Sequence, residues 1–408
     1  MGGYLGIPDD LDALLTMYKQ AGIGVAGTSA IFLPLKEGST GPKFGQDLKP
    51  NEARFQDGVR RKSNLGKPGT SAELPLTANL DLFGYPLHGF CALADTVSVV
   101  AIEGTNDGGL GYADGPVVVT IAAPGGGGTT ATATATAAGG KVMFPLTIWN
   151  GKIINPGSGY NFSTPPVVTI AAPGGGGTTA TATAVVRYHH SGKAVKGVLP
   201  LYTLEDVIAA NLLYVYLDQI FTDLNIDFEI EGNFAPSFTT MGSGLPPIEA
   251  TAPIDSTPTI VGSGQPASML NWATLEDGVD SGIIEKCSLK MKRTPMSINP
   301  SGSNGVARDL WSGSIDIAVT ATAFFNGFTR IRQSRALTLT ALKNIITQGY
   351  NALQIFVPEL EVKPVGEIKK EKDKPRTFDI EGGGIYDSNV NSPVFFDLYN
   401  TVATHSTT

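Results

Sequence analysis

The chain has 408 residues, 42% of them hydrophobic, with 50 glycines, 27 prolines and a formal net charge of −8. This composition excludes a wholly disordered chain, and the length predicts two or three domains with sizeable cores. Cys91 and Cys287 are too few for a disulfide framework. No apolar run is long enough to span a bilayer, and the first residues lack the basic and apolar regions of a signal peptide.

The first hundred residues are expected to begin with a helix and to continue as extended segments. Apolar residues at helical spacing predict a helix over 9–20. Residues 31–72 read as short extended pieces that include a polar, charged arm. Strict alternation over 73–82 predicts a half-buried strand, and the more apolar residues 85–94 predict a short helix.

Residues 101–195 contain one segment written twice. The run from Val119 to Ala135 returns from Val168 to Ala184, at an offset of 49 residues. Each copy predicts a short apolar strand, a glycine turn that can adopt positive φ, and a Thr/Ala strand of period two. The turn residues are Gly125, Gly126, Gly127 and Gly128 in the first copy and Gly174, Gly175, Gly176 and Gly177 in the second.

The duplicated segment differs in composition from both of its flanks, since it carries almost no charge and is rich in Gly, Thr and Ala. Such shifts mark domain boundaries. We therefore expect three parts: an N-terminal part (1–100), an inserted all-β repeat domain on the outer surface (101–197), and the remainder of the main β domain (198–408).

The charge is unevenly distributed after the duplicated segment. Residues 197–285 contain acidic residues but no Lys or Arg, and basic residues follow from Lys286 onward. Two interpretations stay open. The acidic stretch is a solvated surface facing a basic strand, or it is a surface that must not bind nucleic acid, because phosphate neutralisation supplies much of that affinity.

Helices and strands alternate in the predictions for the last half of the chain. Helices are expected at 203–223 and 338–347, and a long polar loop, mobile or ordered by a partner, at 242–282. Strands are expected at 227–231, 286–292, 315–323, 353–357 (ended by Pro358) and 376–380. Many strands and few helices predict a mainly β fold.

No pattern in the chain indicates catalysis, a metal site or a cofactor. The glycine turns lack the Lys and Ser/Thr of a phosphate loop. The four histidines, His88, His189, His190 and His405, have no ligands at metal-binding spacing, so we expect exposed polar side chains. Both cysteines have apolar neighbours and are expected to be buried small hydrophobes. We expect no enzyme activity.

Asp227, Glu229 and Glu231 alternate with Phe228 and Ile230. This spacing predicts three carboxylates on one strand face and apolar side chains on the other. The carboxylates could be imagined as acid/base partners, but a solvated or deliberately negative face is the preferred interpretation. Pairing across strands with Lys290 and Lys292 is an alternative.

The order of these features resembles the tail tube protein (major tail protein) of bacteriophages with long, non-contractile tails. The resemblance covers most of residues 30–100 and 203–402. It rests on the opening segment from Phe32, the Gly-Lys-Pro-Gly turn at 66–69, the strand-like run 223–234, and the closing strands 353–362 and 377–382. The duplicated segment is a departure from the family pattern, and its Gly-Ser-Gly-Tyr, Pro-Pro-Val-Val and glycine sequence resembles a pattern found in phage virion proteins.

The resemblance implies a β-sandwich or small barrel with a flanking helix, assembled as homo-hexameric rings that stack into a hollow tube. The implied partners are the tape measure protein in the lumen and the tail terminator and tail-tip proteins. Genomic DNA would pass through without specific binding, and no membrane partner is implied. The implied location is the virion, after synthesis in the host cytoplasm.

The resemblance also assigns roles to charged residues. Asp227, Glu229 and Glu231 would face the lumen. The residues of the inter-ring arm would be Glu52, Arg54, Arg60, Arg61 and Lys62. The alternatives are another phage structural role (major capsid, capsid decoration or tail-tip adhesin protein) and, more distantly, a secreted carbohydrate-binding β protein.

Overall fold

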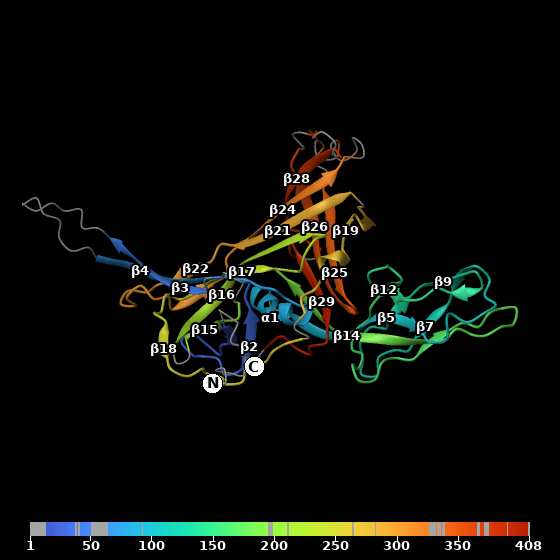
Figure 1. Cartoon of the computed structure of the whole chain (residues 1–408), viewed down its shortest axis with the longest axis horizontal. Coiled ribbons are helices and arrows are strands. Elements are labelled where there is room, and N and C mark those ends of the chain that lie inside the picture. The colour runs from blue at the N-terminus through green and yellow to red at the C-terminus, as the bar shows by residue number, and fades with distance from the viewer. Residues whose placement is uncertain are drawn as a thin grey trace, which may run out of the picture.

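The computed structural model describes residues 14–406 except 37–38, 40, 50–63, 92, 195–198, 210–211, 263–264, 282, 326–331, 333–335, 337–338, 365–367, 371–374 and 390. In this described part the chain is mainly β, as predicted, with the α-helix α1 (Leu80–Cys91) and a 3-10 turn, η1 (Met269–Asn271) (Figure 1). None of the helices described is long and apolar enough to cross a membrane.

A smaller sheet lies beside α1 and is built from antiparallel strands that are distant in sequence. In order across the sheet they are β2 (Ala30–Pro34), β1 (Leu14–Lys19), β15 (Tyr202–Ala209), the first half of β16 (Leu212–Glu229) and β18 (Ile248–Ala250). The second half of β16 belongs to a larger sheet. Strand β16 is therefore long enough to take part in both sheets, and it joins them.

The larger sheet begins at β3, near the N-terminal part of the chain. Its first strands are β3 (Pro42–Lys49), β4 (Asn64–Pro75), β17 (Ser237–Met241), β16, β21 (Ile284–Arg293), β24 (Ile315–Phe324) and β28 (Thr377–Gly384). Strand β28 also pairs with β27 (Ile368–Lys369) and with the end of β26 (Asn351–Val362).

Strand β26 connects this run to two further groups of strands. On one side lie β25 (Thr340–Gln348), β19 (Trp272–Glu276) and β20 (Val279–Asp280). On the other side lie β29 (Phe395–Asn400), β14 (Ala182–Lys193), β5 (Ala94–Gly104) and β11 (Leu146–Thr147). A separate ribbon pairs β22 (Met296–Ile298) with β23 (Asp309–Trp311). Among the described residues no sheet closes on itself.

One large hydrophobic cluster fills the space between these strands and α1. Strict alternation supplies it: Cys287, Leu289 and Met291 of β21 are buried, while Lys286, Lys290 and Lys292 are exposed. Asn79 directly precedes helix α1, and its side-chain Oδ1 accepts a hydrogen bond from the Leu82 amide at 2.7 Å, as an N-cap does.

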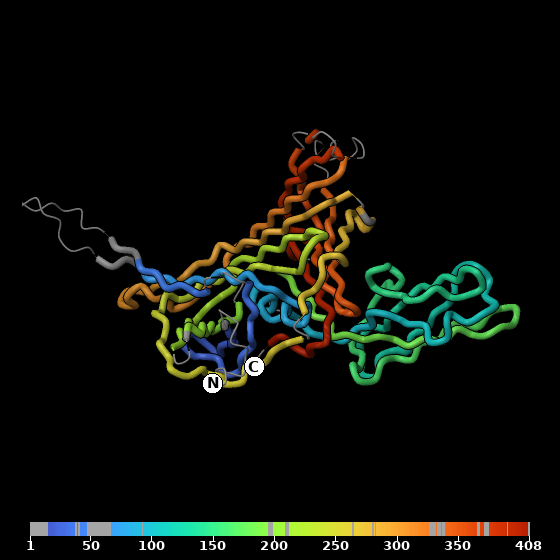
Figure 2. Tube along the Cα trace, viewed as in Figure 1, coloured from blue at the N-terminus to red at the C-terminus, as the bar shows by residue number. Residues whose placement is uncertain are grey.

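The duplicated segment forms a lobe (residues 105–181) that projects from the rest of the molecule, here called the body. Figure 2 shows the chain leaving and re-entering the body along β5 and β14. The lobe strands are β6 (Gly115–Val117), β7 (Val119–Ile121), β8 (Thr132–Ala133), β9 (Ala135–Ala138), β10 (Lys141–Val142), β12 (Ile153–Asn155) and β13 (Val168–Ile170). A hydrophobic cluster of its own, which extends onto β5 and β14, holds these strands together.

The two copies in the lobe are related by a local two-fold axis. Strands β7 and β13 pair antiparallel so that Thr120 lies opposite Thr169, its own equivalent at the 49-residue offset. Val119 correspondingly lies opposite Ile170, and Ile121 opposite Val168. The duplication in sequence is therefore an internal dimer in space.

Three predicted helices are wrong where the structure describes them. The predicted helix 9–20 contains β1, 203–223 is covered by β15 and β16, and 338–347 contains β25. In β1, for example, Leu15, Thr16, Met17 and Tyr18 are all buried because the strand lies between β2 and β15. A strand buried on both faces lacks clean alternation, so its apolar residues mimic a helical stripe.

Other predictions are partly corrected. The predicted helix 85–94 exists but begins earlier, at Leu80, so the strand predicted for 73–82 ends at Pro75. The predicted loop 242–282 contains β18, η1, β19 and β20 and contributes buried Ala267 and Met269 to the core. Strand β26 continues through Pro358, where its register with β25 shifts, so no ladder hydrogen bond is lost there. Strand β29 was not expected.

Candidate functional site: the polar face of the larger sheet

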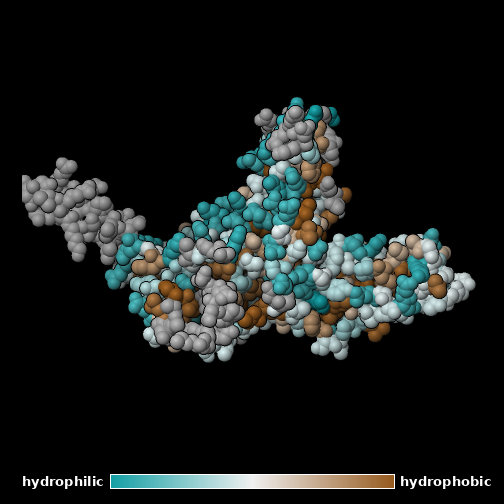
Figure 3. All heavy atoms as spheres, in the orientation of Figure 1, coloured by the Kyte–Doolittle hydropathy of each residue, from teal (hydrophilic) through white to brown (hydrophobic). Residues whose placement is uncertain are grey.

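The most extensive candidate site is the outward face of four neighbouring strands, β16, β21, β24 and β28. We call it the polar face. Its side chains alternate with the buried ones of the core. They are Asp223, Asn225, Asp227, Glu229, Lys286, Ser288, Lys290, Lys292, Asp316, Ala318, Thr320, Thr322, Asp379 and Glu381. In Figure 3 hydrophilic colour covers this part of the body, whereas much of the lobe is pale.

Acidic and basic residues of this face lie opposite each other across the strands. Glu229 is opposite Lys286, with Oε1 and Nζ 3.9 Å apart. Lys292 is opposite Asp223 on one side and Asp316 on the other. At the β28 edge Lys369 pairs with Asp379, with Nζ 2.6 Å from Oδ2. Exposed pairs of this kind add little stability, but they offset the charge of Lys286, Lys292 and Lys369.

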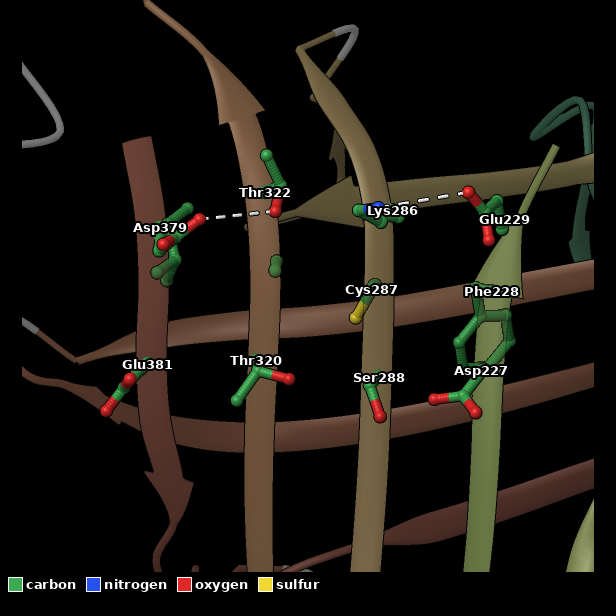
Figure 4. A pocket seen from close by; sticks show the side chains of 12 residues that line it. Asp227, Phe228, Glu229, Lys286, Cys287, Ser288, Thr320, Thr322, Asp379 and Glu381 are labelled. Atoms are coloured by element: carbon green, nitrogen blue, oxygen red, sulfur yellow. Dashed lines mark hydrogen bonds and ion pairs between the residues drawn. The ribbon is translucent and has the colours of Figure 1, made fainter. Parts of the chain in front are cut away.

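A shallow groove of about 390 Å³ lies on this face (Figure 4). Figure 4 shows Asp227 and Glu229 on one strand, Lys286 and Ser288 on the next, and Asp379 and Glu381 across the groove. The side chains point outward from parallel rows and do not converge on one point. The arrangement can present a long, hydrated surface to a large partner, but it does not enclose a small molecule.

Two of the three predicted acidic residues share the predicted strand face. Asp227 and Glu229 are exposed on β16, and Phe228 is buried behind them. Glu231 lies beyond the end of β16, and Ile230, expected in the core, is 50% exposed. Lys290 and Lys292, the alternative partners of the three carboxylates, lie opposite Asn225 and Asp223 instead. Asp379 and Glu381 were not expected on this face, although the alternation of 377–381 could have indicated them.

The predicted arm residues Glu52, Arg54, Arg60, Arg61 and Lys62 lie outside the described residues. The glycine turns are described, and each packs on the other copy of the repeat. Gly128 adopts φ +135°, and a β-carbon there would lie 2.3 Å from the Ser158 carbonyl oxygen. Its equivalent Gly177 (φ +138°) lies equally close to the Leu110 carbonyl oxygen. These glycines are therefore structural.

Tyrosine hydroxyls complete the contact between the copies. Tyr112 of the first copy donates to the Ala171 carbonyl oxygen and accepts from the Ala180 amide, both at 2.9 Å. Tyr160 of the second copy accepts from the Ala131 amide at 2.7 Å. Each Gly-Tyr segment thus binds the strand that follows the glycine turn of the other copy.

The histidines are not exposed as expected. His88, His190 and His405 are buried, and His189 is partly buried. Burial lowers the pKa of His88 to about 4 and, with the neighbouring His190, the pKa of His405 to about 2. No sequence pattern indicates this cluster, because its members come from positions far apart in the chain. No group of three His, Cys, Asp or Glu side chains in the described residues is arranged to hold a metal ion.

Ser98, His189 and Asp397 are ordered as in a hydrolase triad. His189 Nε2 lies 2.6 Å from Asp397 Oδ1, and its Nδ1 is 3.5 Å from Ser98 Oγ. However, Ser98 is fully buried, and its hydroxyl donates to the Gly157 carbonyl oxygen at 2.7 Å. No substrate carbonyl can reach that hydroxyl in this conformation, so the geometry is structural.

Both cysteines are buried, as predicted. Burial raises the pKa of the Cys91 thiol and of the Cys287 thiol to about 12. The reactive thiolate is therefore scarce at neutral pH.

Comparisons with known proteins do not place the chain in a family. A scan against protein-family models and a search of curated proteins both returned no match.

Proposed function

We propose that this chain is a structural virion subunit that forms stacked hexameric rings, which make up the tail tube of a phage with a long, non-contractile tail. In this role it is a conduit for genomic DNA and not an enzyme. The polar face would line the lumen, and the lobe would project outward. The sandwich or barrel architecture of the family would be completed in the ring.

The observation that carries this proposal is the composition of the polar face. It is broad and solvent-exposed, and a fully packed core lies behind it. DNA binding gains affinity when lysines replace the counterions of phosphates. Lys286, Lys292 and Lys369 instead face carboxylates of neighbouring strands. A surface built in this way suits DNA that must slide past without being held.

The open sheets support a role in assembly. Strands β3 and β20 each pair on one side in the described structure. An edge strand presents unpaired amide and carbonyl groups, which favour pairing with another chain. Closure of a ring would satisfy these edges in every subunit.

Negative-stain electron microscopy of the purified full-length protein tests the proposal. Hollow rods built of stacked rings are expected. Closed shells or discrete particles with no axial stacking would contradict it.

A second candidate function is capsid decoration or tail-tip adhesion, and the lobe favours it. The lobe projects from the body (Figure 1) and its strands carry rows of exposed threonines, including Thr132, Thr134 and Thr136. Discrete particles that bind capsids or host surfaces, with no rods, would support this function over the tube.

A further inference from the structure

Three histidines from distant positions meet where residues 401–406 cross α1. The ring of His405 lies 4.4 Å from that of His190 and 4.7 Å from that of Tyr85, measured between centroids. His405 is 1% exposed. The ring lies against α1 at Gly84, where a β-carbon would be only 2.2 Å from His405 Nε2. The helix has a glycine at the position where the histidine needs space.

Asn400 fixes the protonation of His405. Its Nδ2 donates to the Leu80 carbonyl oxygen at 3.1 Å and to His405 Nε2 at 2.9 Å. Because Nε2 accepts this bond, it carries no proton, and the neutral ring has its proton on Nδ1. That Nδ1 is buried with no hydrogen-bond partner in the structure. The site therefore accommodates the neutral ring and has no acceptor for a second proton.

The charges around His405 oppose its protonation. His190 has an oxygen acceptor at each ring nitrogen: Asp95 Oδ1 at 2.7 Å from Nδ1, and the Val402 carbonyl oxygen at 2.9 Å from Nε2. The His190 ring itself lies 4.4 Å from the His405 ring. His88 is a further titratable neighbour on α1, and Lys19 of β1 donates to Ser406 Oγ. On the opposing side, Asp81 of α1 accepts from the Thr401 amide and hydroxyl.

We propose that residues 401–406 form an acid-released clasp, held against α1 by neutral His405 and expelled when that ring is protonated. The direction of the pH effect follows from the difference in the pKa of His405 between the closed and the released state. The pKa of His405 in the closed state is lowered to about 2 by burial and by His190, while a released histidine titrates near its ordinary value of 6.5. Below about pH 6.5 the released state takes up a proton that the closed state refuses, so acid favours release.

A single fluorine label can report on the clasp. Ala403 is exposed, and both native cysteines are buried with raised thiol pKa values, so an Ala403→Cys variant can be tagged at one site with a trifluoromethyl reagent. The 19F resonance is followed from about pH 7.5 to about pH 4.5. The bound signal should be lost in favour of a narrow, mobile one, while near-UV circular dichroism of the body is unchanged.

Two variants in the tagged background separate this mechanism from general acid unfolding. His405→Gln can accept from Asn400 but cannot titrate, so the transition should disappear. Gly84→Ala should give the mobile signal already at neutral pH, although alanine favours helices by about 1 kcal/mol over glycine. A bound signal that persists to the lowest pH in the parent, an unchanged midpoint in His405→Gln, or release that coincides with loss of the near-UV signal would overturn the proposal.

Discussion

The body and the lobe are both β structures, but they differ in the length of their strands and in the side chains that fill their cores. The body uses long strands and large side chains. Phe221, Phe228, Phe238 and Phe396 are almost fully buried there. The lobe uses strands of two to four residues and a core containing many alanines, such as Ala131, Ala135 and Ala180. Its cohesion depends more on glycine turns and tyrosine hydroxyls.

This difference indicates which contacts determine the fold of each region. In the body, hydrogen bonds join strands that are distant in sequence. Strand β1 near the N-terminus, for example, pairs with β15, which begins at Tyr202. In the lobe, the decisive contacts join equivalent segments of two copies of one sequence. The lobe is therefore expected to fold or fail as a unit, and the body should tolerate its loss.

Excision of the lobe is the strongest way to break the comparison. Thr105 and Thr181 face each other where the lobe begins: the Thr105 amide donates to the Thr181 carbonyl oxygen at 2.8 Å. Replacing 105–181 with a short turn should leave a folded body. Replacing 102–195, close to the boundaries expected from composition, should abolish cooperative unfolding because it removes β14, which pairs with β29 in the body. Thermal melts followed by circular dichroism check both deletion variants.

Equal melts for the two excisions would show that β14 is dispensable to the body. Failure of both would show that the lobe is needed for the body to fold and that the two regions are not independent.

Substitution of the turn glycines should damage the lobe alone. At Gly128 and Gly177 alanine would be strained by the positive φ and would contact a carbonyl oxygen of the other copy. Each change should cost the lobe about 2–4 kcal/mol. Gly125 and Gly174 are matched controls, since a β-carbon there meets nothing within 4 Å. Hydrogen exchange should show faster exchange in lobe peptides and unchanged body peptides; equal effects from the controls would contradict this account.

The lobe also shows how much of a structure can be predicted from local sequence. The repeated run of Val119–Ala135 indicated strand, glycine turn and strand, and the structure has β7, a turn with Gly127 and Gly128 at positive φ, and β8 and β9. What could not be predicted was the pairing of the copies. The pairing depends on how closely each glycine turn fits against a carbonyl oxygen of the other copy, and the position of that oxygen is known only from the tertiary structure.

The body resisted prediction for a physical reason. Residues 203–223 contain enough apolar residues at helical spacing to fit a helix, yet β15 and β16 are buried in a sheet whose partners lie near residues 14–19 and 286–293. The mainly β class and the polar alternation of β21 and β24 were predictable because one face of each strand is wet. The histidine cluster was not, since His88 lies on α1, His190 on β14 and His405 in the segment after β29, and these come together only in the tertiary fold.

Acid should weaken the body through His88 as well as through the clasp. Burial lowers the pKa of His88 to about 4, and its Nδ1 accepts from the Leu93 amide at 3.2 Å. The unfolded chain binds a proton near pH 6.5 that the folded chain refuses, so stability falls as pH drops below that value. The loss should approach about 3 kcal/mol at pH 4. A His88→Asn variant in the His405→Gln background should show a smaller decrease in melting temperature between pH 7 and pH 4; an undiminished decrease would show that other groups dominate.

The smallest effects are expected on the polar face, where exposed charges change stability little. Glu229→Lys places like charges opposite Lys286 and should cost about 0.2–1 kcal/mol. Glu231→Lys is the matched control, because Glu231 lies beyond the strand and should leave stability unchanged within error.

If the face lines the lumen of a tube, replacing Asp227, Glu229 and Glu231 together with lysine should permit rods to form but create salt-sensitive DNA retention, since each new lysine can displace phosphate counterions. Anisotropy of labelled DNA at increasing salt, measured on rods verified by microscopy, would decide. Rods that retain no more DNA than the parent would show that the polar face does not meet DNA.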